Sequence, residues 1–220
     1  MIDLQIAHGG GVNNHGKINQ NNVTKEQLLY SINSGFKLIE IDICYIENTI
    51  SVVHDPTHKS QITFENVIDI AVTNNIRIIL DIKGTSEKFK KSLDIINNYI
   101  KKHNAQDNFI IQVYNYGDVV YLNSLKVFKN VLIANWKSYP SIDEISNMIT
   151  YCDKNQINIV GTSLWSKYSK NFYKHCDYYK FYANKNIQIY VHGGGCNDST
   201  IVNDYLKNNI GIFSKLKFIR

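Results

Sequence analysis

The sequence has little of what marks several large classes of protein. Only two of its 220 residues are proline, and no Pro- or Gly-rich linker divides the chain. The four cysteines show neither C-x-x-C spacing nor histidine pairs at zinc-finger distances. No run approaches the roughly 18 apolar residues of a membrane span, and no basic and apolar leader follows Met1. These absences predict one soluble, reduced, cytoplasmic domain without a transmembrane segment.

The charge pattern argues against nucleic acid as the main partner. Lys and Arg number 24 against 19 Asp and Glu, which gives a formal net charge of +5. The densest group of lysines lies on one expected helix, between residues 88 and 102, where a solvated helix face explains it better than a groove for a polyanion. The mild positive balance suits a small anionic substrate instead.

Short apolar runs rich in Ile and Val alternate with longer segments of helical period. Eight strands are expected at Leu4–His8, Lys37–Cys44, Ile76–Lys83, Phe109–Tyr114, Val131–Trp136, Ile157–Thr162, Ile187–His192 and Ile210–Ser214. Helices are expected near Thr24–Ser34, Phe64–Asn74, Ser86–His103, Tyr116–Leu125, Ile142–Asn155, Lys170–Asn184 and Ser199–Asn208. A further run, Ile50–His54, is a candidate hairpin partner of the second strand.

Alternation of this kind calls for a parallel sheet, because parallel neighbours need crossover helices. Eight strand–helix units favour a compact (β/α)8 TIM barrel over residues 1–220, with a short or missing last helix. An open, doubly wound sheet is the competitor, but no G-x-G-x-x-G lies in the first strand-to-helix turn to favour it.

Ionisable side chains gather where the expected strands end, which is where a barrel of this type carries its active site. Residues i and i+2 of a strand share one face, so Glu40 and Asp42 point the same way, and Asp81 and Lys83 do likewise. The apolar residues between them suit the helix-facing side. We therefore expect three carboxylates and a lysine to point into the barrel.

Such a cluster needs a cation, because unpaired buried carboxylates are costly. All-oxygen ligands suit one hard divalent ion, Mg²⁺ or Ca²⁺, better than zinc. The alternative is a structural ion-pair network around Lys83. The repetition of the pattern on two adjacent strands, with histidines beside it, favours the metal site.

Two of the seven histidines, His8 and His54, fall at the same expected end of the barrel. Two imidazoles can serve as general base and general acid on opposite sides of a phosphorus atom. A metal ion would polarise a phosphate oxygen, and Lys83 would add a positive contact. Three further residues near strand ends are possible pocket residues: Gln112, Trp136 and His192.

The segments IAHGG, EID, VVHDP and LDIKG, in this order and at these intervals, resemble the glycerophosphodiester phosphodiesterase family, within the phospholipase C-like phosphodiesterases. Later segments, VHGGGCND and NNIGIFS, look like the seventh and eighth strands of that family. The resemblance implies two catalytic histidines, three metal-binding carboxylates and a phosphate-contacting lysine. These fall in turn on His8 and His54, on Glu40, Asp42 and Asp81, and on Lys83.

The chain departs from the family pattern at three places. Gly9 stands where the family usually has Arg, Asp81 where it has Glu, and His192 with three glycines where a W-T-V-N type segment is usual. We expect a metal-dependent phosphodiesterase that converts a glycerophosphodiester-like substrate to an alcohol and a phosphomonoester. Two alternatives stay open: a different headgroup, such as a cell-surface polysaccharide or a nucleotide-linked diester, and a barrel that binds a phosphorylated ligand without turnover.

Overall fold

The structure, a computed structural model, describes residues 4–12, 19–128, 130–135, 141–163, 181–192, 199–207 and 209–214. Its strands are β1 (Gln5–Ala7), β2 (Leu38–Ile46), β3 (Thr49–Ser51), β4 (Arg77–Lys83), β5 (Phe109–Val113), β6 (Val131–Asn135), β7 (Ile159–Ser163), β8 (Gln188–His192) and β9 (Gly211–Ser214). Its helices are α1 (Lys25–Asn33), α2 (Phe64–Thr73), α3 (Ser86–Lys102), α4 (Tyr116–Leu125), α5 (Ile142–Asn155) and α7 (Ser199–Lys207), with short 3-10 turns at His8–Gly10 and Gln106–Asn108.

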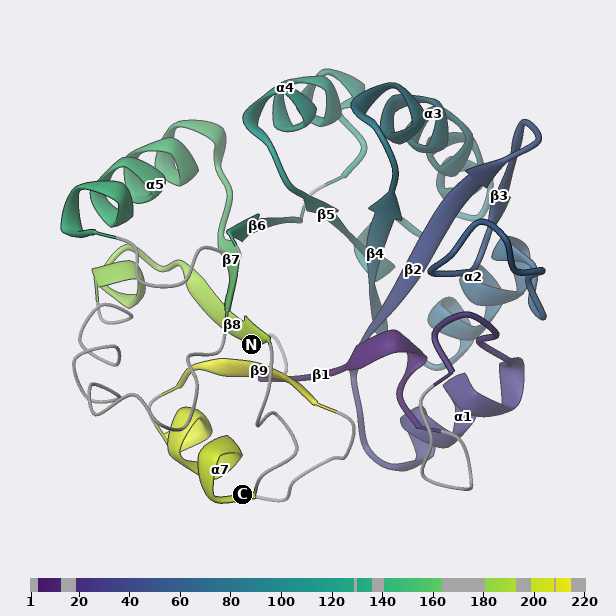
Figure 1. Cartoon of the computed structure of the whole chain (residues 1–220), viewed down its shortest axis with the longest axis horizontal. Helices are drawn as coiled ribbons and strands as arrows, with labels where there is room; N and C mark the ends of the chain where they lie inside the picture. Colours follow the sequence, from purple (N-terminus) through teal and green to yellow (C-terminus); the bar gives the residue numbers. More distant parts are fainter. Residues whose placement is uncertain are drawn as a thin grey trace.

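Eight of these strands form a closed parallel barrel, with the helices outside it (Figure 1). The strands follow one another in the order β1-β9-β8-β7-β6-β5-β4-β2, and β1 also pairs with β2, which closes the ring. The remaining strand, β3, pairs antiparallel with β2, so the expected hairpin partner is present. The (β/α)8 fold predicted from the alternation is confirmed. The segment after β9, where the sequence predicts a short or missing last helix, and most of the expected helix Lys170–Asn184 lie outside the described residues.

Each strand separates its side chains into an inner and an outer set, because neighbouring residues of a strand point to opposite faces. Inside, one buried cluster takes residues from all eight barrel strands, among them Leu38, Ile79 and Phe213, and fills the barrel as a packed layer. Outside, a larger cluster joins residues such as Ile41 and Leu80 to the helices. Polar residues two positions beyond the inner apolar ones therefore face the barrel interior.

Side-chain caps define where several helices begin. The Thr24 side chain accepts a hydrogen bond from the backbone N–H of Gln27, and Ser141 forms a reciprocal capping box with Glu144, as their spacing in the sequence predicts. Among the described residues, no helix combines the length and the apolar character needed to cross a membrane.

Candidate active site

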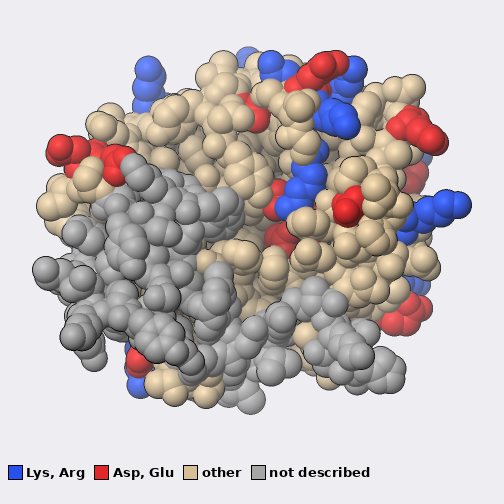
Figure 2. Space-filling view, in the orientation of Figure 1, with Lys and Arg blue, Asp and Glu red and all other residues tan. Residues whose placement is uncertain are grey.

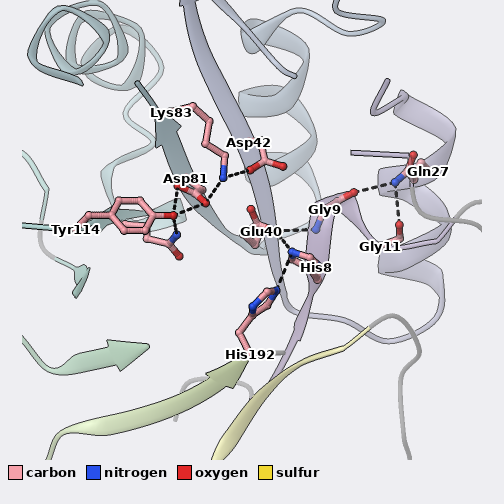
Figure 3. Close-up of polar contacts among 11 residues, drawn as sticks. His8, Gly9, Gly11, Gln27, Glu40, Asp42, Asp81, Lys83, Tyr114 and His192 are labelled. Atoms are coloured by element: carbon pink, nitrogen blue, oxygen red, sulfur yellow. Dashed lines mark hydrogen bonds and ion pairs between the residues drawn. The ribbon is translucent and has the colours of Figure 1, made fainter. Parts of the chain in front are cut away.

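Three buried carboxylates meet inside the barrel. Glu40 and Asp42 come from β2, and Asp81 comes from β4, which pairs with β2 so that Asp42 and Asp81 are direct neighbours (Figure 3). One oxygen of each carboxylate lies within 4.8 Å of the others. All three side chains are buried. The inward orientation expected from the i, i+2 spacing is what the strands produce.

The environment of Glu40 and Asp42 favours their protonated forms. Burial, followed by repulsion from Asp42 and Asp81, raises the pKa of Glu40 well above its usual range. Burial also raises the pKa of Asp42, although Lys83 acts in the opposite direction. A group of carboxylates held together against this penalty is a favourable place for a cation.

Lys83 supplies one positive charge to the cluster. Its ammonium nitrogen lies 2.7 Å from Asp42 Oδ1 and 2.6 Å from Asp81 Oδ2. Burial alone would lower the pKa of Lys83, but attraction to Asp81 and Asp42 outweighs burial and raises it, so the side chain stays cationic. One ammonium cannot balance three carboxylates, and the second oxygen of Asp42 is buried with no hydrogen-bond partner among the described residues. The donor set therefore fits one additional hard cation.

Charged groups also reach the surface here. Figure 2 shows acidic and basic atoms side by side near the middle of one face of the molecule, in a hollow bordered in part by uncharged side chains. The Lys83 side chain is 26% exposed, whereas the Asp42 and Asp81 side chains are 3% and 8% exposed. A substrate entering this hollow would meet the lysine before the carboxylates.

His8 lies directly beyond the end of β1, in a 3-10 turn rather than in the strand itself. Its Nε2 atom lies 3.9 Å from Glu40 Oε2 and 3.1 Å from Nε2 of His192, which ends β8 (Figure 3). The backbone N–H of Gly9 donates to the same Glu40 oxygen at 2.7 Å. The turn thus attaches the first histidine to the carboxylate cluster.

The glycines that follow His8 are held by α1. Gln27 Nε2 donates to the carbonyl oxygens of Gly9 at 3.0 Å and Gly11 at 2.8 Å, and Ser31 Oγ donates to that of Gly10 at 2.8 Å. The three glycines adopt positive φ angles, and a Cβ at Gly11 would overlap Ser31. The Gly9 amide already donates to Glu40. The loop therefore acts as a tight turn that positions His8, rather than as a set of free backbone amides that could bind a phosphate.

His54 is exposed in the loop that follows β3. Its backbone N–H donates to the carbonyl oxygen of Gln20 at 3.2 Å, and the next residue, Asp55, donates its N–H to Asn21 Oδ1 at 2.9 Å. Burial dominates the rise in the pKa of Asp42, and His54 is among the groups that act against this rise, so the imidazole lies within electrostatic reach of the cluster. The hairpin made by β2 and β3 returns the chain to the barrel end that carries His8.

Tyr114 is a member of the site that sequence reasoning missed. Its hydroxyl lies 2.7 Å from both oxygens of Asp81 and accepts a hydrogen bond from Gln112 Nε2 at 2.7 Å. Burial, then the negative charge of Asp81, raises the pKa of Tyr114, so the hydroxyl remains a donor. The spacing of Gln112 and Tyr114, two residues apart in the expected strand Phe109–Tyr114, was the signal that could have found it.

The structure describes two of the three possible pocket residues, Gln112 and His192. Gln112 is buried, and its Oε1 atom has no hydrogen-bond partner among the described residues. His192 contacts His8, as described above. Trp136 lies outside the described residues.

Solved structures of phosphodiesterases share this fold. The chain is similar to a glycerophosphodiester phosphodiesterase from Parabacteroides distasonis, with a TM-score of 0.71 and 15% identity over 97% of this chain and 93% of that one. It is similar to a phosphodiesterase from Oleispira antarctica in complex with the product sn-glycerol-3-phosphate. The TM-score is 0.71 and the identity is 12%, over 97% of this chain and 92% of that one. The chain is also similar to a glycerophosphodiester phosphodiesterase from Agrobacterium tumefaciens, with a TM-score of 0.68 and 11% identity over 98% of this chain and 96% of that one.

No family model matches the chain, and no curated protein matches it by sequence. The structural likeness extends over nearly the whole chain, in agreement with the resemblance carried by the sequence motifs. At identities this low, it establishes a shared fold with these phosphoric diester hydrolases. Chemistry has to be argued from the site itself, because one barrel fold supports many reactions.

Proposed function

We propose that this protein is a metal-dependent phosphodiesterase that hydrolyses a glycerophosphodiester-like substrate to an alcohol and a phosphomonoester. The observation that carries the proposal is the cluster of Glu40, Asp42 and Asp81 with Lys83 among them and His8 beside them. The fold shared with glycerophosphodiester phosphodiesterases, one of them solved with sn-glycerol-3-phosphate, supports the same substrate class.

One divalent ion, Mg²⁺ or Ca²⁺, would be held by Glu40, Asp42 and Asp81. These residues offer only oxygen atoms, and Asp42 Oδ2 is buried without a partner in the part of the chain that the structure describes, which suits a hard cation. A bound ion would polarise a non-bridging phosphate oxygen and offset the charge that develops during the reaction. Lys83, the partly exposed cation beside these carboxylates, would bind another phosphate oxygen.

The two histidines would move the protons. His8 and His54 lie in different loops, one after β1 and one after β3. In-line displacement at phosphorus requires a base for the attacking oxygen and an acid for the leaving oxygen, and imidazole groups suit both roles near neutral pH. We assign these roles to the pair, with either a substrate hydroxyl or water as the attacking group.

The direct test is turnover by His8→Ala and His54→Ala, measured as the alcohol and phosphomonoester released from a glycerophosphodiester. General acid–base catalysis typically contributes about 10²–10⁴-fold to the rate, so each variant should lose at least about a hundredfold in kcat. His103→Gln, which alters a histidine that follows α3 at the opposite end of the barrel, serves as the matched control. Near-normal turnover by either alanine variant would remove that histidine from the mechanism.

The replacement of Arg by Gly9 supports a second candidate within the same chemistry. The Gly9 amide is already donated to Glu40, so this position offers no cation and no free amide to a phosphate. A substrate with a headgroup other than glycerol would then be preferred. Comparison of diesters that differ only in the alcohol separates the two candidates, because the metal dependence should be the same for both.

A further inference from the structure

A third histidine belongs to the candidate site. His192 ends β8, and its Nε2 atom lies 3.1 Å from Nε2 of His8. Strand β9 lies between β8 and β1 in the barrel, so the two side chains meet across one intervening strand (Figure 3). At this separation the two nitrogens are within hydrogen-bond distance of each other.

Packing limits the freedom of both rings. The imidazoles of His8 and His192 meet edge to face, with their centroids 4.5 Å apart and an angle of 67° between their planes. Phe213 of β9 also packs edge to face against both, with centroids 6.2 Å from His8 and 5.3 Å from His192. Such edge-to-face contacts favour one ring orientation over others. The two imidazoles and Phe213 therefore pack against one another at this end of the barrel.

The chemistry of imidazole restricts the pair further. A neutral imidazole has one N–H and one lone pair, so a hydrogen bond between two Nε2 atoms requires one ring to donate and the other to accept. Burial lowers the pKa of His192, which favours its neutral form. Such a hydrogen bond couples the two rings, because the ring that donates carries its proton on Nε2 and the ring that accepts carries its proton on Nδ1.

We infer that His192 is a positioning residue for His8: its hydrogen bond sets the ring orientation and the tautomer in which His8 faces the substrate. Nothing in the sequence motifs that carry the resemblance assigns this role, because the usual segment at this strand lacks a histidine. The catalytic consequence rests on the proposed function of His8, whereas the hydrogen bond itself does not.

The tautomer of His8 can be measured without any substrate. In protein labelled with ¹⁵N-histidine, long-range ¹H–¹⁵N correlations distinguish the two nitrogens, and His8→Gln identifies the His8 signals. The spectra are recorded with EDTA, about two pH units above the ordinary histidine pKa of about 6.5. We expect a single His8 tautomer in the wild type; a rapidly averaged mixture there would overturn the inference.

Two substitutions of His192 separate a hydrogen bond from simple packing. His192→Phe keeps a ring against Phe213 but removes the nitrogen, and should convert His8 to a mixture of tautomers. His192→Gln places a polar atom near the former Nε2 position and should restore one tautomer. His103→Gln, at the opposite end of the barrel, should leave the His8 signals unchanged. Unchanged His8 signals in His192→Phe would contradict the inference.

Turnover gives the second readout. His192→Phe should lower kcat by about tenfold, the loss expected for one neutral hydrogen bond, and should leave KM within about twofold. His192→Gln should recover most of kcat. A single His8 tautomer in a wild-type protein that cleaves no phosphodiester would contradict the proposed function but support the hydrogen bond. Full kcat in His192→Phe, with normal turnover in the wild type, would contradict the positioning role alone.

Discussion

Replacing Lys83 with methionine removes the ammonium from the carboxylate cluster while it keeps a side chain of similar length. Lys83 Nζ lies 2.7 Å from Asp42 and 2.6 Å from Asp81, and both carboxylates are buried. Without the ammonium, the metal-free protein must hold three carboxyl groups in the barrel with no positive charge between them. The substitution therefore tests how costly the cluster is in the absence of an ion.

The size of the effect follows from burial. Removal of one partner from a buried ion pair destabilises a protein by about 3–5 kcal/mol. Because the Lys83 side chain is 26% exposed, solvent screens part of the interaction, and we expect a loss of about 3 kcal/mol at neutral pH. Lys91→Met is the matched control: Lys91 pairs with Glu87 at 2.7 Å on an exposed helix face, where solvent screens the pair and its loss should change stability little.

The assay is urea unfolding followed by circular dichroism, first in EDTA and then in excess Mg²⁺ or Ca²⁺. In EDTA, Lys83→Met should lower the midpoint far more than Lys91→Met. An ion at about a hundred times its Kd stabilises the folded state by about 2.7 kcal/mol, so added metal should restore much of the lost stability. If Lys83→Met were as stable as the wild type in EDTA, the reasoning about an unbalanced cluster would be refuted.

Three further substitutions probe the same region. Because the pKa of Glu40 is raised above its ordinary value of 4.5, the metal-free folded state retains a proton that the unfolded chain loses. The free energy of unfolding in EDTA should therefore fall as the pH rises above about 4.5, and should fall less in Glu40→Gln. Tyr114→Phe removes the hydroxyl donor to Asp81 and should weaken ion binding by about tenfold in calorimetry, with unchanged affinity contradicting a role for the hydroxyl. Gly11→Ala would place a Cβ at a φ of 85° and in overlap with Ser31 of α1, so it should lower the free energy of unfolding by about 1–3 kcal/mol. The control Gly117→Ala, at the start of α4, should not lower it. Equal urea midpoints for the two variants would contradict this prediction.

Much of the fold could be predicted because its main signals are local. The alternation in β2 places Ile39, Ile41 and Ile43 among the outer residues and Glu40 and Asp42 inside, and this depends only on the geometry of an extended chain. Closure of the barrel then follows from the number of strand–helix units. The grouping of the carboxylates was predictable for the same reason, since neighbouring parallel strands end at the same edge.

Contacts between distant segments were not predictable in the same way. The hydrogen bond from Tyr114 to Asp81 depends on the register of β4 against β5, and the contact between His8 and His192 depends on the closure of the ring. The place of His8 in a turn, rather than in a strand, depends on how Gln27 binds the glycine carbonyls. The residue pattern of one segment does not indicate which distant residues its side chains will contact.

We propose that the carboxylate cluster and its histidines hydrolyse phosphodiesters with the help of one divalent ion. The most direct test measures alcohol and phosphomonoester released from a panel of phosphodiesters in Mg²⁺, in Ca²⁺ and in EDTA. We predict cleavage of at least one glycerophosphodiester-like compound that is abolished by EDTA, restored by added ion, and weakened in Asp42→Asn at limiting metal. Turnover that EDTA leaves unchanged, or a complete absence of turnover across the panel in either ion, would contradict the claim.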